Sequence, residues 1–137
     1  MVWTSRPVRR LAGSIRAPGD KSCSHRALIF GGLASGVSRF TGLLEGDDVI
    51  RTGLAMAAMG SEVARTGPGA WEVRGVGTKG LASPKDGLDF GNSGTGSRLM
   101  MGVMAGFDLT GELRGDASLS SRPMNRVLNP LREMGMK

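Results

Sequence analysis

Apolar and polar positions along the chain follow two rhythms, which predict helices and strands in turn. Uncharged apolar stretches at 27–37 and 99–107 predict two helices, and a polar loop that ends in arginine precedes each of them. Alternation across 62–76, around a Thr-Gly-Pro-Gly turn, predicts a β-hairpin. Further strands are expected around Ile15 and at 88–90. The predicted order is therefore βαβαββ, after which a second unit begins in the same way.

Two more helices are predicted from spacing and capping residues. Asp47 or Asp48 can cap the first of these, and Gly60 closes it. Its expected buried face holds Ile50, Leu54 and Ala57.

The last predicted helix has Pro123 in its first turn and Gly135 as its left-handed cap. Pro130 falls inside the pattern and favours a kink or an early end. The apolar positions at helical spacing are Met124, Val127, Leu128, Leu131 and Met134.

A duplication organises the chain. Residues 41–47 read TGLLEGD and residues 110–116 read TGELRGD, and the polar loop and apolar stretch before each copy recur as well. We interpret 16–86 as a first βαβαββ unit and 87–137 as a second unit that stops before its closing strands. The fold class is α/β, and the 137 residues form part of a duplicated domain.

Charge and rare residues narrow the chemistry. The net charge is +6 with a pI near 10.7, which favours an anionic partner, although the arginine excess (14 of 18 basic residues) also fits codon bias. Cys23 and His25 are the only residues of their kinds, so a disulfide framework, a cysteine zinc cluster and a metal cofactor are not expected. No apolar stretch approaches the ~18 residues of a membrane span, and we expect a reduced, cytoplasmic setting.

Three places could hold an oxyanion at the start of a helix, where free N–H groups carry partial positive charge. The first is the loop 18–26, in which Lys21 and Arg26 would contribute more than the helix dipole. The second is the glycine-rich loop 91–98, and the third is Arg122. Each also has an ordinary interpretation: a capped helix start with a solvated basic side chain, or a flexible turn.

Other polar residues are interpreted as structural. His25 and Cys23 have no visible catalytic partner, and the carboxylates of Asp47, Asp48 and Asp116 stand at cap-like positions. We therefore identify no general base in the chain and expect no cofactor.

Three motifs resemble one family in order and spacing. PGDKSCSHRAL at 18–28, LDFGNSGTGSRL at 88–99 and GDASLSSRPMNRVLNPLREMG at 115–135 are similar to the amino-terminal part of the EPSP synthases. The resemblance covers nearly the whole chain, and the third motif is closer to the bacterial class noted for glyphosate tolerance. It implies repeated βαβαββ units of the enolpyruvyl transferase fold, an inside-out α/β barrel.

The resemblance also implies a reaction and its residues. These enzymes transfer the enolpyruvyl group of phosphoenolpyruvate to the 5-hydroxyl of shikimate 3-phosphate, and Lys21 would be the catalytic residue that contacts both substrates. The shikimate 3-phosphate residues would be Lys21, Ser22 and Arg26. The phosphoenolpyruvate residues would be Lys21, Asn92, Gly94, Thr95 and Arg122.

The departures from the family lead to further expectations. Family members are far longer, so this chain alone should have no turnover without the missing carboxy-terminal part. Residues 1–15 would pack on the other domain, leaving 16–137 as an incomplete amino-terminal domain. Gly94 stands where tolerant members carry alanine, so glyphosate should inhibit the complete enzyme. The alternative is a non-catalytic anion-binding or nucleic-acid-binding α/β module; the chain has no Tyr and few other aromatics for base stacking.

Overall fold

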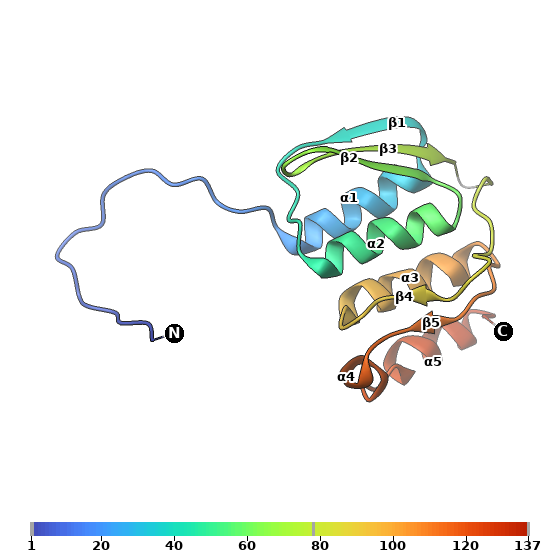
Figure 1. Ribbon diagram of the computed structural model, residues 1–137. Coiled ribbons are helices and arrows are strands. Elements are labelled where there is room, and N and C mark those ends of the chain that lie inside the picture. The colour runs from blue at the N-terminus through green and yellow to red at the C-terminus, as the bar shows by residue number, and fades with distance from the viewer. Residues whose placement is uncertain (1, 78, 137) are drawn as a thin grey trace.

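The computed structural model describes residues 2–77 and 79–136 (Figure 1). In chain order, its elements are α1 (Lys21–Leu33), β1 (Ser35–Phe40), α2 (Asp47–Ala58), β2 (Glu62–Gly67), β3 (Ala70–Val76), β4 (Leu88–Asp89), α3 (Gly94–Gly106), β5 (Leu113–Arg114), α4 (Ala117–Ser120) and α5 (Asn125–Glu133). No helix in this part of the chain is long and apolar enough to span a bilayer.

Two sheets organise the strands. β1, β3 and β2 form an antiparallel sheet in that order, with Phe40 opposite Trp71 and Val63 opposite Val73. The predicted hairpin over 62–76 is thereby confirmed. β4 and β5 pair in parallel, with Leu88 opposite Leu113. Helices α1 and α2 lie against one face of the larger sheet, and α3 lies on the far side of α2 (Figure 1).

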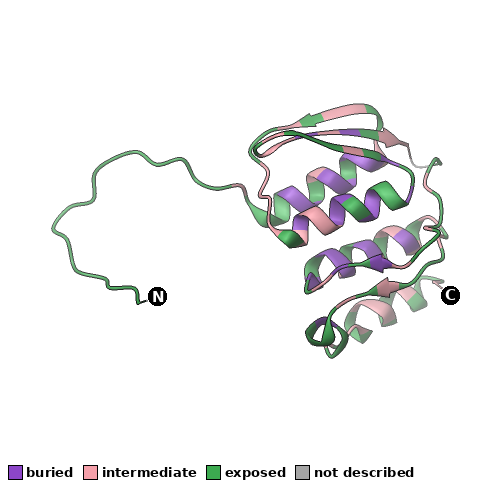
Figure 2. Cartoon of the chain, in the orientation of Figure 1, coloured by how far each residue is buried: buried purple, intermediate pink, exposed green. Residues whose placement is uncertain are grey.

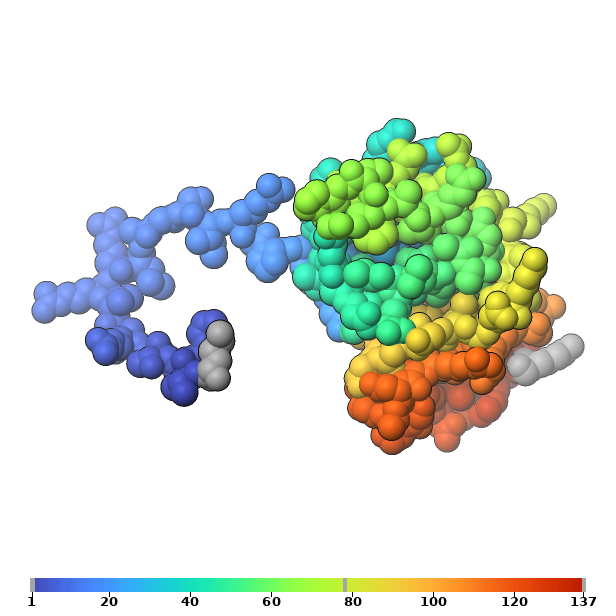
Figure 3. Space-filling view, viewed as in Figure 1, coloured from blue at the N-terminus to red at the C-terminus, as the bar shows by residue number. Residues whose placement is uncertain are grey.

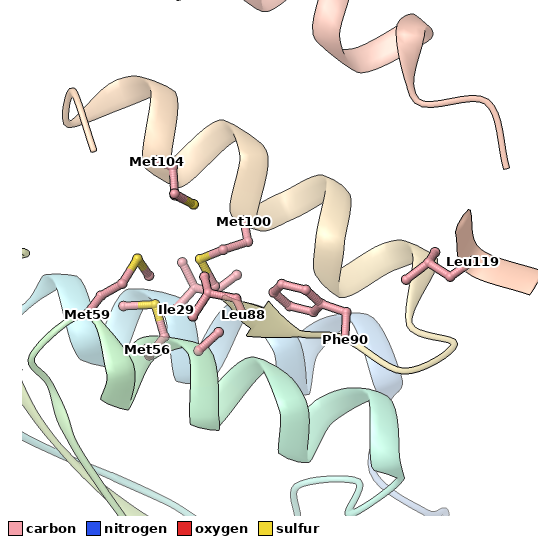
Figure 4. Packing of buried hydrophobic residues seen from close by; sticks show 9 residues of the cluster. Ile29, Met56, Met59, Leu88, Phe90, Met100, Met104 and Leu119 are labelled. Atoms are coloured by element: carbon pink, nitrogen blue, oxygen red, sulfur yellow. The ribbon is translucent and has the colours of Figure 1, made fainter. Parts of the chain in front are cut away.

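The buried residues form two clusters, one on each side of the layer of α1 and α2, and Figure 2 colours the buried positions of these helices. The cluster between that layer and the larger sheet is Leu28, Val49, Trp71 and Val73. The cluster between that layer and α3 is Ile29, Ala55, Met56, Met59, Leu88, Phe90, Met100, Met104 and Leu119 (Figure 4). Since α1 contributes to both clusters, it has apolar residues on two faces and little amphipathic contrast.

Most of the predicted loop 18–26 is helical, because α1 already begins at Lys21. Asp20 caps this helix, because its side chain accepts a hydrogen bond of 2.6 Å from the backbone N–H of Cys23. Gly19 lies against the backbone of 42–44, where any side chain would collide with Gly42 and Leu44. The predicted loop 91–98 is likewise shorter than expected, because α3 begins at Gly94 and only residues 91–93 precede the helix.

The strand expected around Ile15 is absent. Residues 2–20 hold no helix or strand, and Ile15 is 94% exposed. A strand needs a neighbour for its backbone hydrogen bonds, and no described strand lies beside this segment, which extends away from the body (Figure 3). The two duplicated segments differ because only one has a neighbouring strand. Residues 113–114 form β5 beside β4, whereas the matching residues 44–45 form no strand. Packing of residues 1–15 on another domain stays a prediction.

Helix α2 corrects two expectations. Gly46 is its N-cap, while Asp47 and Asp48 stand in its first turn. Leu54 is 62% exposed and Ala57 is exposed, so these two residues of the expected face were wrong, whereas Ile50 is partly buried against the core. Because α2 packs against α1 on one side and α3 on another, its buried face is wider than a single stripe. The buried residues are Val49, Thr52, Gly53, Ala55 and Met56.

The chain between β5 and the end forms two helices where one was expected. The short α4 follows Asp116, and α5 begins only at Asn125, so Pro123 precedes α5 and does not lie in its first turn. Pro130 lies inside α5, which continues to Glu133. The helix therefore tolerates the loss of one backbone hydrogen bond, because proline has no N–H to donate. Gly60 and Gly135 do take positive φ after their helices, as predicted.

Candidate functional site

The first turns of α1, α2 and α3 lie at one end of the molecule, together with α4 (Figure 1). Side-chain contacts join these ends: Lys21 pairs with Asp48 at the start of α2, and Arg122 donates to Asn92 ahead of α3. Three helix N-termini, each the positive end of a helix dipole, therefore face the same way. This end of the molecule carries every residue that the sequence assigns to substrate binding.

The α1 part of the site is an exposed basic surface. Lys21, Ser22 and Arg26 are all exposed on the first two turns of the helix. Ser22 and Arg26 are four residues apart and share a helix face, whereas Lys21 is turned toward α2 and its partner Asp48. The Arg26 Nη2 group lies 3.4 Å from the Sγ of Cys23, which leaves most of its donors free for an anion.

The α3 part of the site is a hydrogen-bonded cluster around Asn92. Its amide oxygen accepts from Arg122 Nη2, and its Nδ2 group donates to Asp116 Oδ2 at 2.7 Å. A Cβ added at Gly94 would lie 2.8 Å from Arg122 Nη1, so the guanidinium rests directly over this glycine. Thr95 is exposed beside them.

Asp116 was correctly predicted as a cap. It is the N-cap of α4, and its Oδ1 accepts from the Leu119 N–H at 2.7 Å. The Leu119 N–H, and then the Asn92 amide, lower the pKa of the Asp116 carboxyl below its usual range. The charged carboxylate thus orients Asn92, which in turn orients Arg122.

Asp48 and Arg98 are site neighbours that the sequence did not single out for a role in binding. Asp48 had been interpreted only as a cap, and its pairing with Lys21 depends on the packing of α1 on α2. Arg98 lies 3.3 Å from the position of a Cβ on Gly94, and its Nε is buried without a hydrogen-bond partner. The arginine at the end of each polar loop was a visible signal, and Arg98 lies near Gly94 because the two are four residues apart on α3.

His25 is wholly buried one turn below Lys21. Its Nδ1 lies 2.8 Å from Thr52 Oγ1, while Nε2 has no partner. Burial, and then the nearby charge of Lys21, lower the pKa of His25; the charge of Asp48 acts in the opposite direction. The ring is therefore held neutral, as suits the structural role that we assigned to it.

We expect this histidine to make folding sensitive to mild acid. Its folded-state pKa lies below the unfolded value of about 6.5, so the unfolded chain takes up the proton first and stability falls as the pH drops below about 6.5. Urea unfolding at pH 7.5 and pH 5.5 measures the change. His25→Gln should flatten it, and an equal pH dependence in both proteins would contradict the expectation.

No three His, Cys, Asp or Glu side chains gather in a metal-binding group within residues 2–77 and 79–136. Beside the carboxylates of Asp48 and Asp116, this end carries arginine, lysine, amide and hydroxyl donors, which are suited to phosphate and carboxylate oxygens.

Comparison with known proteins identifies the family. A sequence model for EPSP synthase (3-phosphoshikimate 1-carboxyvinyltransferase) matches residues 5–137. The chain belongs to the EPSP synthase family. A 3-phosphoshikimate 1-carboxyvinyltransferase from Hyphomonas neptunium is 80% identical over the whole chain, and one from Chelativorans sp. is 61% identical over 96% of it. The chain spans about 30% of the length of these relatives.

Solved structures of the family share the fold. An EPSP synthase from Acinetobacter baumannii superposes with a TM-score of 0.85 at 44% identity, over 90% of this chain and 28% of that one. The α/β class and the enolpyruvyl transferase fold expected from the motifs are thus confirmed for a partial domain.

Proposed function

We propose that this chain is the amino-terminal part of an enzyme that transfers the enolpyruvyl group of phosphoenolpyruvate to the 5-hydroxyl of shikimate 3-phosphate. The observation that carries the proposal is the meeting of three helix N-termini at one end, where Lys21, Arg26 and Arg122 are placed. Two multiply charged anions repel each other, and basic side chains on helix N-termini offset that repulsion. Membership of the family supports the same reaction.

Each half of this end suits one substrate. Ser22 and Arg26 share an exposed helix face, which would bind shikimate 3-phosphate. Arg122 and Asn92 would bind phosphoenolpyruvate, with Thr95 and the Gly94 backbone beside them. Lys21 lies between the two halves, on the side of α2, where its ammonium pairs with Asp48. It would contact both substrates when a substrate oxygen replaces Asp48 as its partner.

A titration of the ¹⁵N-labelled chain with shikimate 3-phosphate tests the proposal. Amide shifts centred on Lys21, Ser22 and Arg26 are expected, and they should saturate. Titration with a polynucleotide is the parallel arm. Strongly salt-dependent polynucleotide binding, with no response to shikimate 3-phosphate, would instead favour a nucleic-acid-binding module.

The chain by itself should not turn over. It spans about 30% of the relatives' length, and we place the remaining carboxylates and basic residues of the site in the part that it lacks. We expect no product when the purified chain is incubated with both substrates, free of complete enzyme. Product formation would contradict this expectation. As part of such an enzyme, the chain belongs in the cytoplasm.

Glyphosate should inhibit a complete enzyme that contains this segment. Gly94 leaves space beneath Arg122, and the Cβ of alanine would lie 2.8 Å from Arg122 Nη1. We expect Gly94→Ala to displace the guanidinium and reduce inhibition. Gly102→Ala is the matched control, because a Cβ there meets nothing within 4 Å. Unchanged activity of the glycine enzyme at high glyphosate would refute the prediction.

A further inference from the structure

Arg51 connects helix α2 to the turn that leads into α3. Its Nε donates to Asp47 Oδ2 at 2.7 Å, and its Nη1 donates to Asp89 Oδ2 at 2.7 Å and to the Asp89 carbonyl at 3.3 Å. Only 26% of the Arg51 side chain is exposed, whereas the side chains of Asp47 and Asp89 are 68% and 63% exposed, so the guanidinium is the shielded partner of both pairs. One guanidinium thus joins two carboxylates that are more than 40 residues apart.

Asp89 passes this connection on to Gly91. Its second oxygen, Oδ1, accepts from the Gly91 N–H at 2.8 Å, so the one carboxylate holds both Arg51 and the turn. This N–H, and then Arg51, lower the pKa of Asp89, which therefore stays charged near neutral pH. Gly91 has a φ of +52°, and a Cβ there would lie 2.6 Å from Arg51 Nε. The guanidinium consequently packs directly on the glycine backbone.

Gly91 stands at the start of the cluster that we assign to phosphoenolpyruvate. Its carbonyl accepts from the Asp116 N–H at 2.8 Å, and the next residue is Asn92, which bonds to Asp116 and Arg122. A displaced Gly91 would therefore move both the Asn92 side chain and the cap of α4. By contrast, no hydrogen bond or ion pair joins Arg51 to Lys21, Ser22 or Arg26 in the part of the chain that the structure describes.

We propose that Arg51 is a positioning residue, which holds the turn 89–92 so that Asn92 and Arg122 are set for the phosphoenolpyruvate phosphate. The inference rests on the proposed function for the identity of that ligand. Arg51 does not touch the substrate; it acts through Asp89 and Gly91. A lysine could not take its place fully, because a single ammonium lacks the planar fork that reaches both Asp47 and Asp89.

The test compares Arg51→Met with Arg74→Met. Arg74 is also an arginine in an ion pair, with Glu62 at 3.1 Å, but it lies on the sheet away from the turn. Without ligand, Arg51→Met should shift the amide resonances of Gly91 and Asn92, whereas Arg74→Met should leave them in place. Shifts no larger than those of Arg74→Met would overturn the inference, whether or not any ligand binds.

Ligand titrations then separate positioning from general damage. Arg51→Met should weaken phosphoenolpyruvate binding about tenfold and leave shikimate 3-phosphate affinity unchanged, and Arg51→Lys should recover part of the loss. Asp89→Asn should reproduce the effect, and adding it to Arg51→Met should cause little further loss. Unchanged phosphoenolpyruvate affinity, or equal losses for both ligands, would overturn the inference. If the unmodified chain binds neither ligand, the proposed function fails, and the ligand-free comparison still decides whether Arg51 positions the turn.

Discussion

Replacing Phe90 with alanine should lower the free energy of unfolding by about 3–5 kcal/mol, the largest stability effect that we expect in this chain. The Phe90 side chain is wholly buried and lies in one cluster with Met56 and Met100 (Figure 4). Alanine would leave a cavity that the surrounding helices fill only in part. A loss of this size is a large fraction of the ~5–15 kcal/mol that stabilises a typical domain.

Urea unfolding at 25 °C measures this loss, and Phe30→Ala is the matched control. Phe30 is 63% exposed on α1, so its truncation should change the free energy of unfolding by only about 0.5 kcal/mol. Similar losses in the two variants would show that Phe90 does not anchor the core. Because Phe90 lies between Asp89 and Gly91, its loss should also disturb the start of the α3 site.

Replacing Lys21 with methionine should weaken shikimate 3-phosphate binding about 10- to 150-fold. A hydrogen bond to a charged group contributes about 1.5–3 kcal/mol, and each 1.4 kcal/mol is a factor of ten in affinity. Methionine retains the length of the side chain and removes only the charge and the donors. The ratio of dissociation constants, from the amide titration of each protein, gives the effect.

Lys85→Met is the control for Lys21→Met, since Lys85 is also exposed and lies outside the site. The affinity of the Lys85→Met variant for shikimate 3-phosphate should stay within about twofold of that of the unmodified chain. Equal weakening in both variants would mean that the net charge, and not Lys21, attracts the ligand. The Lys21 variant should also free Asp48, whose carboxylate then has no lysine partner.

Local patterns predicted those elements that depend on few distant contacts. The hairpin over 62–76 follows from alternation and a Gly-Pro-Gly turn, and Gly60 and Gly135 end helices as expected. Leu54 and Ala57 were wrongly placed on the buried face of α2 because that helix packs against α1 and α3 on different sides. The strand expected around Ile15 does not form because it has no neighbouring strand. Burial and strand pairing depend on which elements meet, and periodicity within one segment does not contain that information.

By itself, the sequence determined the α/β class, the hairpin, the ends of two helices at Gly60 and Gly135 and, through three motifs, the residues proposed for substrate binding. It could do so because capping, turn chemistry and side-chain type act over a few neighbouring residues. The tertiary structure alone decided that three helix N-termini face one way, that Asp48 pairs with Lys21, and that Arg51 reaches Asp89. These contacts join residues 27 and 38 positions apart, and only the packing of α1, α2 and β4 brings them together.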